Sequence, residues 1–442
     1  MKVMVFGLGL SGISASRLSM SLGHATTGVD RFPEAALKIE GSGFSFLTED
    51  AAVDSVREFE LMILSPGIPV DHPLVRTARS QGVPVIGEIE WGYMNCKGRI
   101  VGITGSNGKS TTTALAHSLI KAGGMDARLG GNIGTAFCDA VAGSTESTVF
   151  VLELSSFQLE TVSRFRADVA VMLNITPDHQ DRYTGLAGYA DAKARIFQGQ
   201  DPGCSAILNL EDPVVNDIAK KTKGNRYFFS LAPHDFPGTF LSGGEVVFRD
   251  LSGKTTVLFS EGDLSIRGSH NIENAMAAAM AASLCGTDPG SIREGLRRFR
   301  ALPHRLELVS TAKGVQVYND SKATNTDSVL KALSSFGGNI ILLLGGKDKG
   351  ADFTALAPEI GKRCKKVIAF GSAAGKISEQ LGGMFDIRSF ATLREATEFA
   401  LSSAGSGDVV LLSPACASFD EFRNYEDRGD RFRRYVSEVL AK

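Results

Sequence analysis

The sequence predicts an α/β protein of three consecutive domains, and three observations lead to this prediction. Its 442 residues are enough for about three domains of ordinary size. Short, almost continuously apolar strands alternate with helical segments, which is typical of parallel sheets covered by helices on both faces. Two glycine-rich loops of different type each join such a strand to a helix.

Changes in the pattern of strands and helices along the chain indicate the domain boundaries. Residues 1–95 alternate strands such as Leu61–Leu64 and Val83–Ile86 with helices and Gly/Pro turns. Residues 96–301 form a second stretch, and residues 302–442 return to regular alternation of strands and helices. We therefore expect Rossmann-like domains in the first and third stretches.

The central stretch has a mixed character. It opens on the strand RIVGIT, which leads into a helix, and the buried strands TVFVLEL and VAVMLNI follow. Residues 239–267 then alternate apolar and polar positions between glycine turns, which predicts hairpins. We expect a P-loop ATPase-like α/β domain with a small antiparallel part.

The composition excludes several classes of function. A net charge of -2 gives no excess of basic residues that would bind nucleic acid or a membrane surface. The six cysteines lie far apart without a C-x-x-C pair, which is typical of reduced thiols in a cytosolic protein. The start, MKVMVFG, is no signal peptide, and no apolar run reaches the ~18 residues of a membrane span. We expect a soluble cytoplasmic protein.

The first glycine loop, GLGLSG, has the context of a dinucleotide fingerprint. Two of its glycines would permit a tight turn and a close backbone approach, and the helix that it opens would offer N–H groups to a diphosphate. The expected contacts are Gly7, Gly9, Ser11 and Gly12. Asp30 ends the next strand, where an acid usually meets a ribose or a base. The glycines could instead serve only the turn. By itself, this motif would favour an NAD enzyme.

The second glycine loop, TGSNGKST, predicts a site for a nucleoside triphosphate. Its backbone N–H groups would cradle phosphate oxygens, Lys109 would neutralise the β/γ region, and Ser110 could ligate Mg²⁺. Ile103 stands where the strict pattern has its first glycine, so Gly105 must supply the flexibility. The predicted ATP-binding residues are Gly105, Ser106, Asn107, Gly108, Lys109, Ser110 and Thr111.

A dehydrogenase needs only the first of these loops. Kinase-like or ligase chemistry would use the second loop for ATP and the first for a substrate that carries a nucleotide.

With both loops in view, the chain resembles the Mur ligases of bacterial cell-wall synthesis. The matching blocks run through all three stretches: GLGLSG, SPGIP, GITGSNGKSTTT, GGNIG, VLELSSFQLE, LNITPDHQDRY, AKARIF, GSHNIENA, LPHR, NDSKATN, LLLGGKDKGADF and LLSPACASFDEF. LELSSFQLE and DHQDRY resemble the branch that adds D-glutamate. Local departures from the family pattern are Arg31, Phe32, Lys347 and Tyr425.

The resemblance implies a reaction and its partners. A monomer would join D-glutamate to UDP-N-acetylmuramoyl-L-alanine through an acyl phosphate and release ADP and phosphate. The first domain would bind the UDP substrate, the central domain ATP with two Mg²⁺ ions, and the third the amino acid. The third domain would also close on ATP.

A metal site is expected at the mouth of the central sheet. Glu153 and His179 end adjacent apolar strands, where ligands of parallel sheets collect. Helical periodicity alone would leave Lys193 in solvent, but the resemblance implies that CO₂ carbamylates it, so that it ligates Mg²⁺ beside Ser110. Lys109, Glu153, His179 and Lys193 are the expected catalytic residues.

The resemblance also implies the remaining contacts. Residues around ATP would be Asn271, Asn274, His304, Arg305 and Asp320. The D-glutamate pocket would hold Lys322, Thr324, Lys349, Ser418 and Tyr425. Further substrate contacts would be Ser65, Gly67, Phe419, and, near the reacting carboxyl group, Asn132 and Ser155.

Three other interpretations stay open at this point. The chain could be another Mur ligase or a folate polyglutamate synthetase, although those relatives lack LELSSFQLE. It could be an NAD-dependent oxidoreductase with an added P-loop, which would release no ADP. A non-catalytic ATP-binding scaffold is opposed by the presence of Glu153, His179 and Lys193 together.

Overall fold

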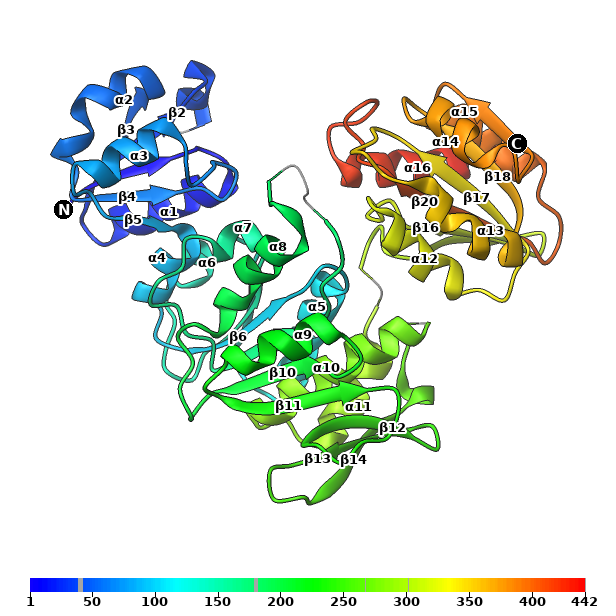
Figure 1. Cartoon of the computed structure of the whole chain (residues 1–442), viewed down its shortest axis with the longest axis horizontal. Coiled ribbons are helices and arrows are strands. Elements are labelled where there is room, and N and C mark those ends of the chain that lie inside the picture. The colour runs from blue at the N-terminus through cyan, green and yellow to red at the C-terminus, as the bar shows by residue number, and fades with distance from the viewer. Residues whose placement is uncertain (39–42, 179–181, 267, 301, 442) are drawn as a thin grey trace. The chain divides into compact units, whose positions relative to one another are not determined.

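Three β-sheets, each flanked by helices, make up the protein in a computed structural model (Figure 1). The structure describes residues 1–38, 43–178, 182–266, 268–300 and 302–441. The chain divides into two compact units, Met1–Leu264 with Ile272–Phe299, and Ser265–Asn271 with Arg300–Lys442. The first unit contains two of the sheets and the second unit contains the third.

The N-terminal sheet is entirely parallel, in the order β3-β2-β1-β4-β5. Its strands are β1 (Lys2–Phe6), β2 (Ala25–Asp30), β3 (Ser45–Thr48), β4 (Leu61–Leu64) and β5 (Val85–Gly87). Its helices are α1 (Leu10–Ser21), α2 (Glu49–Ser55), α3 (Pro73–Ser80) and α4 (Glu88–Asn95). The strand order reverses at β1, and ligands of open sheets bind at such a reversal. The first glycine loop begins there.

The central sheet has nine strands, in the order β14-β13-β12-β11-β10-β9-β6-β8-β7. Its strands are β6 (Arg99–Thr104), β7 (Ala127–Gly131), β8 (Val149–Glu153), β9 (Val169–Met172), β10 (Ser205–Asn209), β11 (Asn225–Ser230), β12 (Gly238–Ser242), β13 (Glu245–Arg249) and β14 (Thr255–Ser260). Its helices are α5 (Lys109–Ala122), α6 (Phe137–Ala140), α7 (Ser156–Leu159), α8 (Gly185–Ala194), α9 (Pro213–Ile218), α10 (Ser269–Cys285) and α11 (Pro289–Arg298).

The hairpins predicted for the central stretch are confirmed. Strands β12, β13 and β14 pair antiparallel, whereas the strands from β7 to β12 pair parallel. The strand β6 lies between β8 and β9, so this sheet also reverses its order where the second glycine loop begins.

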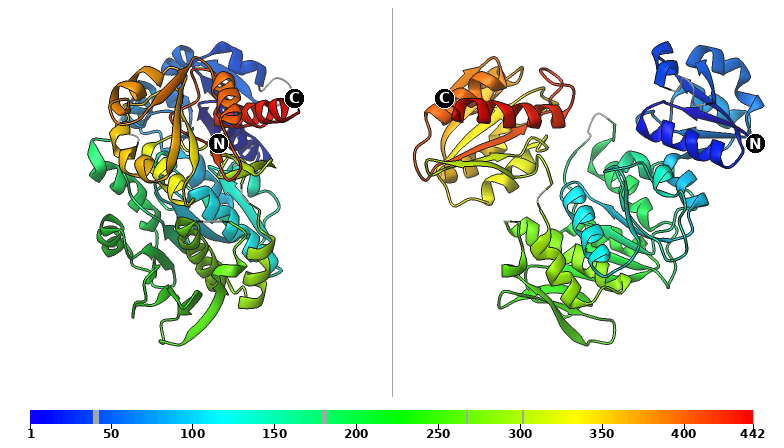
Figure 2. Two further views of the ribbon diagram at one scale, coloured as in Figure 1. Left: turned by 90° about the vertical axis from the view of Figure 1, so that its right-hand side faces the viewer. Right: turned by 180° about the vertical axis from the view of Figure 1, so that it is seen from behind.

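The third sheet follows the order β15-β16-β20-β17-β18-β19, with only β15 antiparallel to its neighbour. Its strands are β15 (Glu307–Ala312), β16 (Val315–Asn319), β17 (Ile340–Gly345), β18 (Cys364–Phe370), β19 (Ile387–Phe390) and β20 (Val409–Ala415). Its helices are α12 (Thr326–Ser334), α13 (Ala357–Arg363), α14 (Ala374–Leu381), α15 (Leu393–Ser402) and α16 (Tyr425–Leu440). Helix α16, red in Figure 2, packs beside α15 and across β15 and β16.

Burial on both faces explains the continuous apolar strands. In β17, Ile341 and Leu343 belong to one core cluster, whereas Ile340, Leu342 and Leu344 belong to another on the opposite face. Such a strand has no solvent face that would require polar residues. In the part of the chain that the structure describes, no helix is long and apolar enough to cross a membrane.

Candidate functional site

The first glycine loop is built for a close backbone approach. Gly7 has φ +91°, and a Cβ on Gly12 would lie 1.9 Å from the carbonyl oxygen of Gly7. Ser65 closes the loop from the neighbouring strand end, because its Oγ donates to the same carbonyl at 2.6 Å. The glycines therefore bring the backbone at the N-terminus of α1 to the surface of the sheet.

Asp30 is fixed by the same loop. Its Oδ2 accepts a hydrogen bond from the N–H of Leu8 at 2.8 Å, and its Oδ1 accepts one from Phe32 at 3.1 Å. Its carboxylate therefore ties the end of β2 to the glycine loop, the place expected for an acid that meets a nucleotide. Leu10 and Phe32 beside it are largely exposed apolar side chains.

The second glycine loop joins β6 to α5 in the geometry of a phosphate loop. Gly105 and Gly108 have φ +151° and +84°. A Cβ on Gly108 would lie 2.3 Å from Oδ1 of Asn274, which also accepts a hydrogen bond from Thr112 at 3.2 Å. The expected ATP residue Asn274 of α10 therefore lies directly against this loop.

Lys109 folds back over the loop that precedes it. Its ammonium donates to the carbonyl oxygens of Gly105 and Ser106, at 2.9 and 2.7 Å. Ser106 is held in turn by Thr176, and the N–H of Asn107 by Oδ1 of Asn174, at 2.8 Å. The cation is thus held where phosphate oxygens would meet the loop.

Lys193 lies buried beside the phosphate loop, and only 1% of it is exposed. Its Nζ lies 3.4 Å from Oγ1 of Thr104 and 4.6 Å from the ring centre of Tyr189. Burial lowers the pKa of Lys193 well below its ordinary value, and the positive charge of Lys109 lowers it further, against opposing effects of Asp178 and Glu153. Helical periodicity alone had suggested a solvated lysine, and the structure shows the opposite.

The structure describes three of the four predicted metal ligands, Ser110, Glu153 and Lys193. Glu153 ends β8 with 1% exposure, and its Oε1 accepts a hydrogen bond from Nδ2 of Asn132 at 2.9 Å. Ser110 is fully buried in the first turn of α5. His179 lies outside the described residues. Among those that are described, no group of three or more His, Cys, Asp or Glu side chains could hold a metal ion.

Ser155 has a local structural role. It caps α7, because its Oγ accepts from the N–H of Gln158 while the Gln158 side chain accepts from the N–H of Ser155. Gly67 has open space around it, and no heavy atom lies within 4 Å of a Cβ added there.

The expected amino-acid residues gather at one edge of the third sheet. Strand β20 lies between β16 and β17, with Leu412 level with Asn319 and Ala415 level with Gly345. Lys322 follows β16, Lys349 follows β17 and Ser418 follows β20. Thr324, Phe419 and Tyr425 lie in the same segments, and Nζ of Lys322 lies 4.9 Å from the ring centre of Tyr425.

The remaining expected ATP residues of the second unit differ in burial. Asp320 is buried, which raises the pKa of its carboxyl group to about 7, and it accepts hydrogen bonds from Ser413 and the N–H of Leu306. His304 and Asn271 are also buried, whereas Arg305 is half-buried, and Asn271 and Arg305 help to line a cavity of about 290 Å³ in this unit.

Three residues that the motif analysis did not single out lie beside the expected site residues. The charge of Asp178 acts on Lys193, and the ring of Tyr189 lies beside its ammonium. Asp178 belongs to the block LNITPDHQDRY, whereas Tyr189 lies before the block AKARIF and had no sequence signal. Arg428 is fully buried under the third sheet's loops. It shares a helical stripe with Phe432, Tyr435 and Val436, and that spacing could have indicated its burial.

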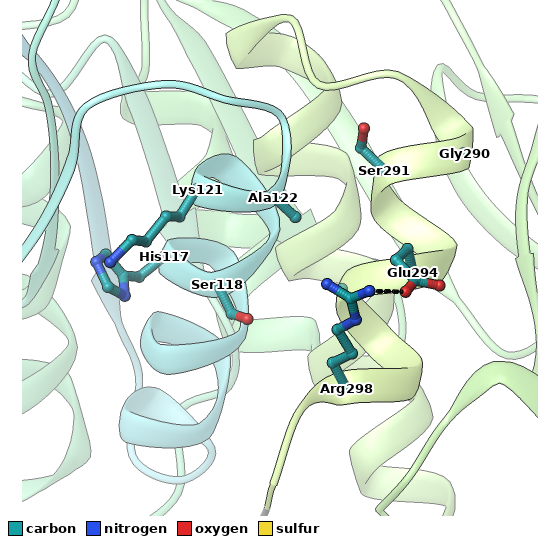
Figure 3. A pocket seen from close by; sticks show the side chains of 9 residues that line it. His117, Ser118, Lys121, Ala122, Gly290, Ser291, Glu294 and Arg298 are labelled. Atoms are coloured by element: carbon teal, nitrogen blue, oxygen red, sulfur yellow. Dashed lines mark ion pairs between the residues drawn. The ribbon is translucent and has the colours of Figure 1, made fainter.

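A further cavity, of about 530 Å³, lies away from these loops between the C-terminal half of α5 and α11 (Figure 3). Lys121, Glu294 and Arg298 are charged residues that line it, and Arg298 pairs with Glu294 at 2.6 Å.

Family models match all three parts of the chain. A model described as the N-terminal domain of MurD-like Mur ligases matches residues 1–87, the Mur ligase middle domain matches 103–282, and the Mur ligase glutamate ligase domain matches 304–416. The chain belongs to the Mur ligase family. These matches confirm the expected resemblance and the three-domain α/β architecture.

Curated relatives of this Mur ligase cover its full length. Proteins named UDP-N-acetylmuramoylalanine--D-glutamate ligase from Koribacter versatilis and Solibacter usitatus are each 42% identical, over 100% of this chain and 98% of theirs. A protein of the same name from Myxococcus xanthus is 40% identical, over 98% of both chains.

Solved structures confirm the fold. UDP-N-acetylmuramate-alanine ligase MurC from Thermotoga maritima is 18% identical, with a TM-score of 0.63 over 99% of this chain and 100% of that one. MurF ligase from the same organism, solved with ADP, is 16% identical, with a TM-score of 0.62 over 99% and 95% of the two chains.

Proposed function

We propose that this Mur ligase joins D-glutamate to UDP-N-acetylmuramoyl-L-alanine and cleaves ATP to ADP and phosphate. The observation that carries the proposal is the presence of two different glycine-rich loops in one chain, each between a strand and a helix, after β1 and after β6. The shared name of relatives 40–42% identical over nearly the whole chain supports the same substrates.

The chemistry requires activation of a carboxylate. A carboxylate oxygen of UDP-N-acetylmuramoyl-L-alanine attacks the γ-phosphorus of ATP, the bond from that phosphorus to ADP breaks, and ADP leaves as an acyl phosphate forms. The neutral amine of D-glutamate then attacks the acyl carbon, phosphate leaves, and the amine loses a proton. Anions meet in both steps, so pre-organised cations and N–H donors stabilise the developing charge.

The phosphate loop prepares this charge stabilisation for ATP. Lys109 exchanges its bonds to Gly105 and Ser106 for bonds to the phosphate oxygens, and residues 105–111 supply backbone N–H groups. Asn271, Asn274, His304, Arg305 and Asp320 hold the rest of the nucleotide.

The residues present fit a Mg²⁺ site, in which Ser110, Glu153, His179 and a carbamate on Lys193 would be the ligands. A bound Mg²⁺ neutralises phosphate charge and orients the transferred group. Glu153 is a buried carboxylate at the end of β8, and carboxylate oxygens are ligands that Mg²⁺ prefers.

Lys193 fits carbamylation better than a cationic role. Its lowered pKa favours the neutral amine, the form that attacks CO₂ to give a carbamate and release a proton. The product is an anion in a site otherwise short of metal-binding carboxylates.

The other expected residues hold the two remaining substrates. Gly7, Gly9, Ser11 and Gly12 hold the diphosphate of the UDP substrate, and Asp30, Ser65 and Gly67 border it. Asn132, Ser155 and Phe419 complete the substrate side. Lys322, Thr324, Lys349, Ser418 and Tyr425 bind D-glutamate.

The enzyme works as a monomer in the cytoplasm, and its six free cysteines fit that reducing compartment.

Phosphate release by the purified protein tests the proposal. It should require ATP, Mg²⁺ and UDP-N-acetylmuramoyl-L-alanine, and D-glutamate but not L-glutamate should stimulate it. Nicotinamide oxidation or reduction without ADP release would instead indicate an oxidoreductase. Equal stimulation by both glutamates would refute the assigned amino acid.

A further inference from the structure

Arg428 is the largest fully buried side chain of the protein's described part. Its guanidinium donates four hydrogen bonds, and every acceptor is uncharged. Nε donates to Oγ of Ser321 at 2.9 Å and Nη2 to the carbonyl oxygen of Ser321 at 2.7 Å. Nη1 donates to the carbonyl oxygens of Cys416 and Ala417, at 3.0 and 3.1 Å.

These acceptors lie immediately before residues of the proposed amino-acid pocket. Ser321 precedes Lys322, and Ala417 precedes Ser418. Arg428 therefore ties the loop after β16 to the loop after β20. Ser321 adds a link to the start of α16, because its Oγ donates to the carbonyl oxygen of Tyr425 at 2.9 Å.

The same contacts reach the third loop of the pocket. Lys347 and Ala417 exchange two backbone hydrogen bonds, at 2.8 and 3.0 Å. A Cβ on Gly346 would lie 3.0 Å from Nη1 of Arg428 and 2.4 Å from the Ala417 oxygen. The guanidinium thus packs against the base of the GGKDKG loop, which carries Lys349.

The charge of Arg428 is not cancelled by a direct partner. In the segments that the structure describes, no carboxylate forms an ion pair with it, although Asp420, Asp320 and Glu421 act on it from farther away. Burial lowers its pKa to about 10, so it is still a cation at neutral pH. A buried charge costs free energy unless it is paired, and neutral donors could hold the same carbonyl groups at lower cost.

We infer that Arg428 is a positioning residue of the amino-acid pocket and also supplies a buried counter-charge to the two carboxylates of its substrate. The inference rests on the proposed function, since it assigns the pocket to a dicarboxylic amino acid. Its fixed fork of N–H donors sets the spacing of the three loops, which the point charge of a lysine could not reproduce. The positive charge then lowers the free energy of a bound dianion.

Two substitutions separate the fork from the charge. Arg428→Lys retains the charge but loses the planar set of N–H donors. Arg428→Gln loses the charge and retains some of the N–H donors. Both should raise the KM for D-glutamate about tenfold or more, and Gln should raise it further than Lys. The KM values for ATP and the UDP substrate should stay within about twofold of wild type, as should kcat at saturating glutamate.

Controls keep the result interpretable. Wild-type phosphate release with D-glutamate must be present first, and its absence would overturn the proposed function itself. Arg431→Lys, on the exposed side of the same helix, should leave all three KM values unchanged. If the Arg428 variants do not fold, Ser321→Ala removes only the bonds of the hydroxyl group and should still raise the KM for D-glutamate severalfold.

Three results would overturn the inference. The first is an equal rise of all three KM values, which would indicate a general structural role. The second is an unchanged KM for D-glutamate in the Arg428 variants or, where those do not fold, in Ser321→Ala. The third is an equal KM for D-glutamate in Arg428→Lys and Arg428→Gln, which would show that the charge of Arg428 does not contribute to glutamate binding.

Discussion

A Cβ on Gly429 would lie 2.1 Å from Nδ1 of His304, so the missing side chain of Gly429 makes room for that imidazole. His304 has a positive φ of 64° and is only 5% exposed. Its Nδ1 also lies 3.0 Å from Nδ2 of Asn319. The LPHR turn therefore rests on α16 through one glycine.

Gly429→Ala should destabilise the second unit by about 1–3 kcal/mol, because the added methyl group forces His304 out of its place. Since His304 is a proposed ATP contact, the KM for ATP should rise as well. Urea unfolding and the three KM values measure both effects. Gly375→Ala in α14 is the control: no heavy atom lies within 4 Å of a Cβ there. It should be neutral or stabilise by up to ~1 kcal/mol, and equal losses in the two variants would contradict the clash.

Lys109→Ala should abolish turnover and leave the UDP substrate bound. The lysine belongs to the phosphate loop after β6, whereas the diphosphate loop follows β1 in a different sheet. Loss of one pre-organised cation should lower kcat by a factor on the order of 10²–10³ or more. Calorimetric titration with the UDP substrate provides the comparison. Equal weakening of that binding would refute the assignment of two separate phosphate sites.

Lys193→Ala should be nearly inactive, and formate or acetate should restore part of the activity. The proposed missing group is the negative charge of a carbamate, and removal of the buried side chain leaves space for a small anion. Rates are measured with increasing carboxylate and, in parallel, with methylammonium. Restoration by the amine but not by carboxylates would show that the cation is the functional form.

Much of the fold could be predicted because its strands are buried on both faces. The predicted strand Leu61–Leu64 coincides with β4. The strand predicted for Val83–Ile86 is instead Val85–Gly87, and Pro84, which has no N–H to donate, lies immediately before it. Both glycine loops were predictable as well, because strand, glycines and helix occur in a fixed local order.

Periodicity alone leaves the burial of Lys193 open and gives only a conflicting signal for Arg428. Lys193 lies on a helix whose small residues Ala190, Ala192 and Ala194 leave its buried face ambiguous, so only tertiary packing decides the burial of the lysine. Arg428 shows a clearer stripe with Phe432, but an arginine in that stripe contradicts the ordinary preference for solvent. Both groups depend on loops brought together from distant parts of the chain.

Lys349→Ala should raise the KM for D-glutamate far more than the KM for ATP or the UDP substrate. Charge-assisted hydrogen bonds are roughly twice as strong as neutral ones, so the loss should affect mainly the dicarboxylate. Lys347→Ala is a matched control two residues earlier, since Lys347 is also exposed and joins Ala417 only through its backbone. If both variants behave alike, or if the glutamate KM does not change, the pocket lies elsewhere.

Glu88→Gln should stabilise the first unit above neutral pH. Glu88 is 2% exposed at the start of α4, and burial raises the pKa of its carboxyl group to about 7, although the N–H of Cys138 donates to Oε1 at 2.7 Å. The folded state therefore binds this proton more tightly than the unfolded state. As pH rises from about 4.5 to 7, the wild type should lose about 3 kcal/mol of stability, and the loss should then level off.

Urea unfolding at pH 5 and pH 8 tests this dependence, and Glu90→Gln provides the contrast. Both oxygens of Glu90 accept from backbone N–H groups, of Ser163, Arg164 and Phe165, at 2.7–3.0 Å. A glutamine would turn one acceptor into a donor that faces N–H groups, so Glu90→Gln should destabilise by about 1–3 kcal/mol at both pH values. Glu88→Gln should instead gain stability relative to wild type only at pH 8. The same gain at pH 5 would mean that the proton on Glu88 has no part in the effect, because at that pH the folded wild type already holds it.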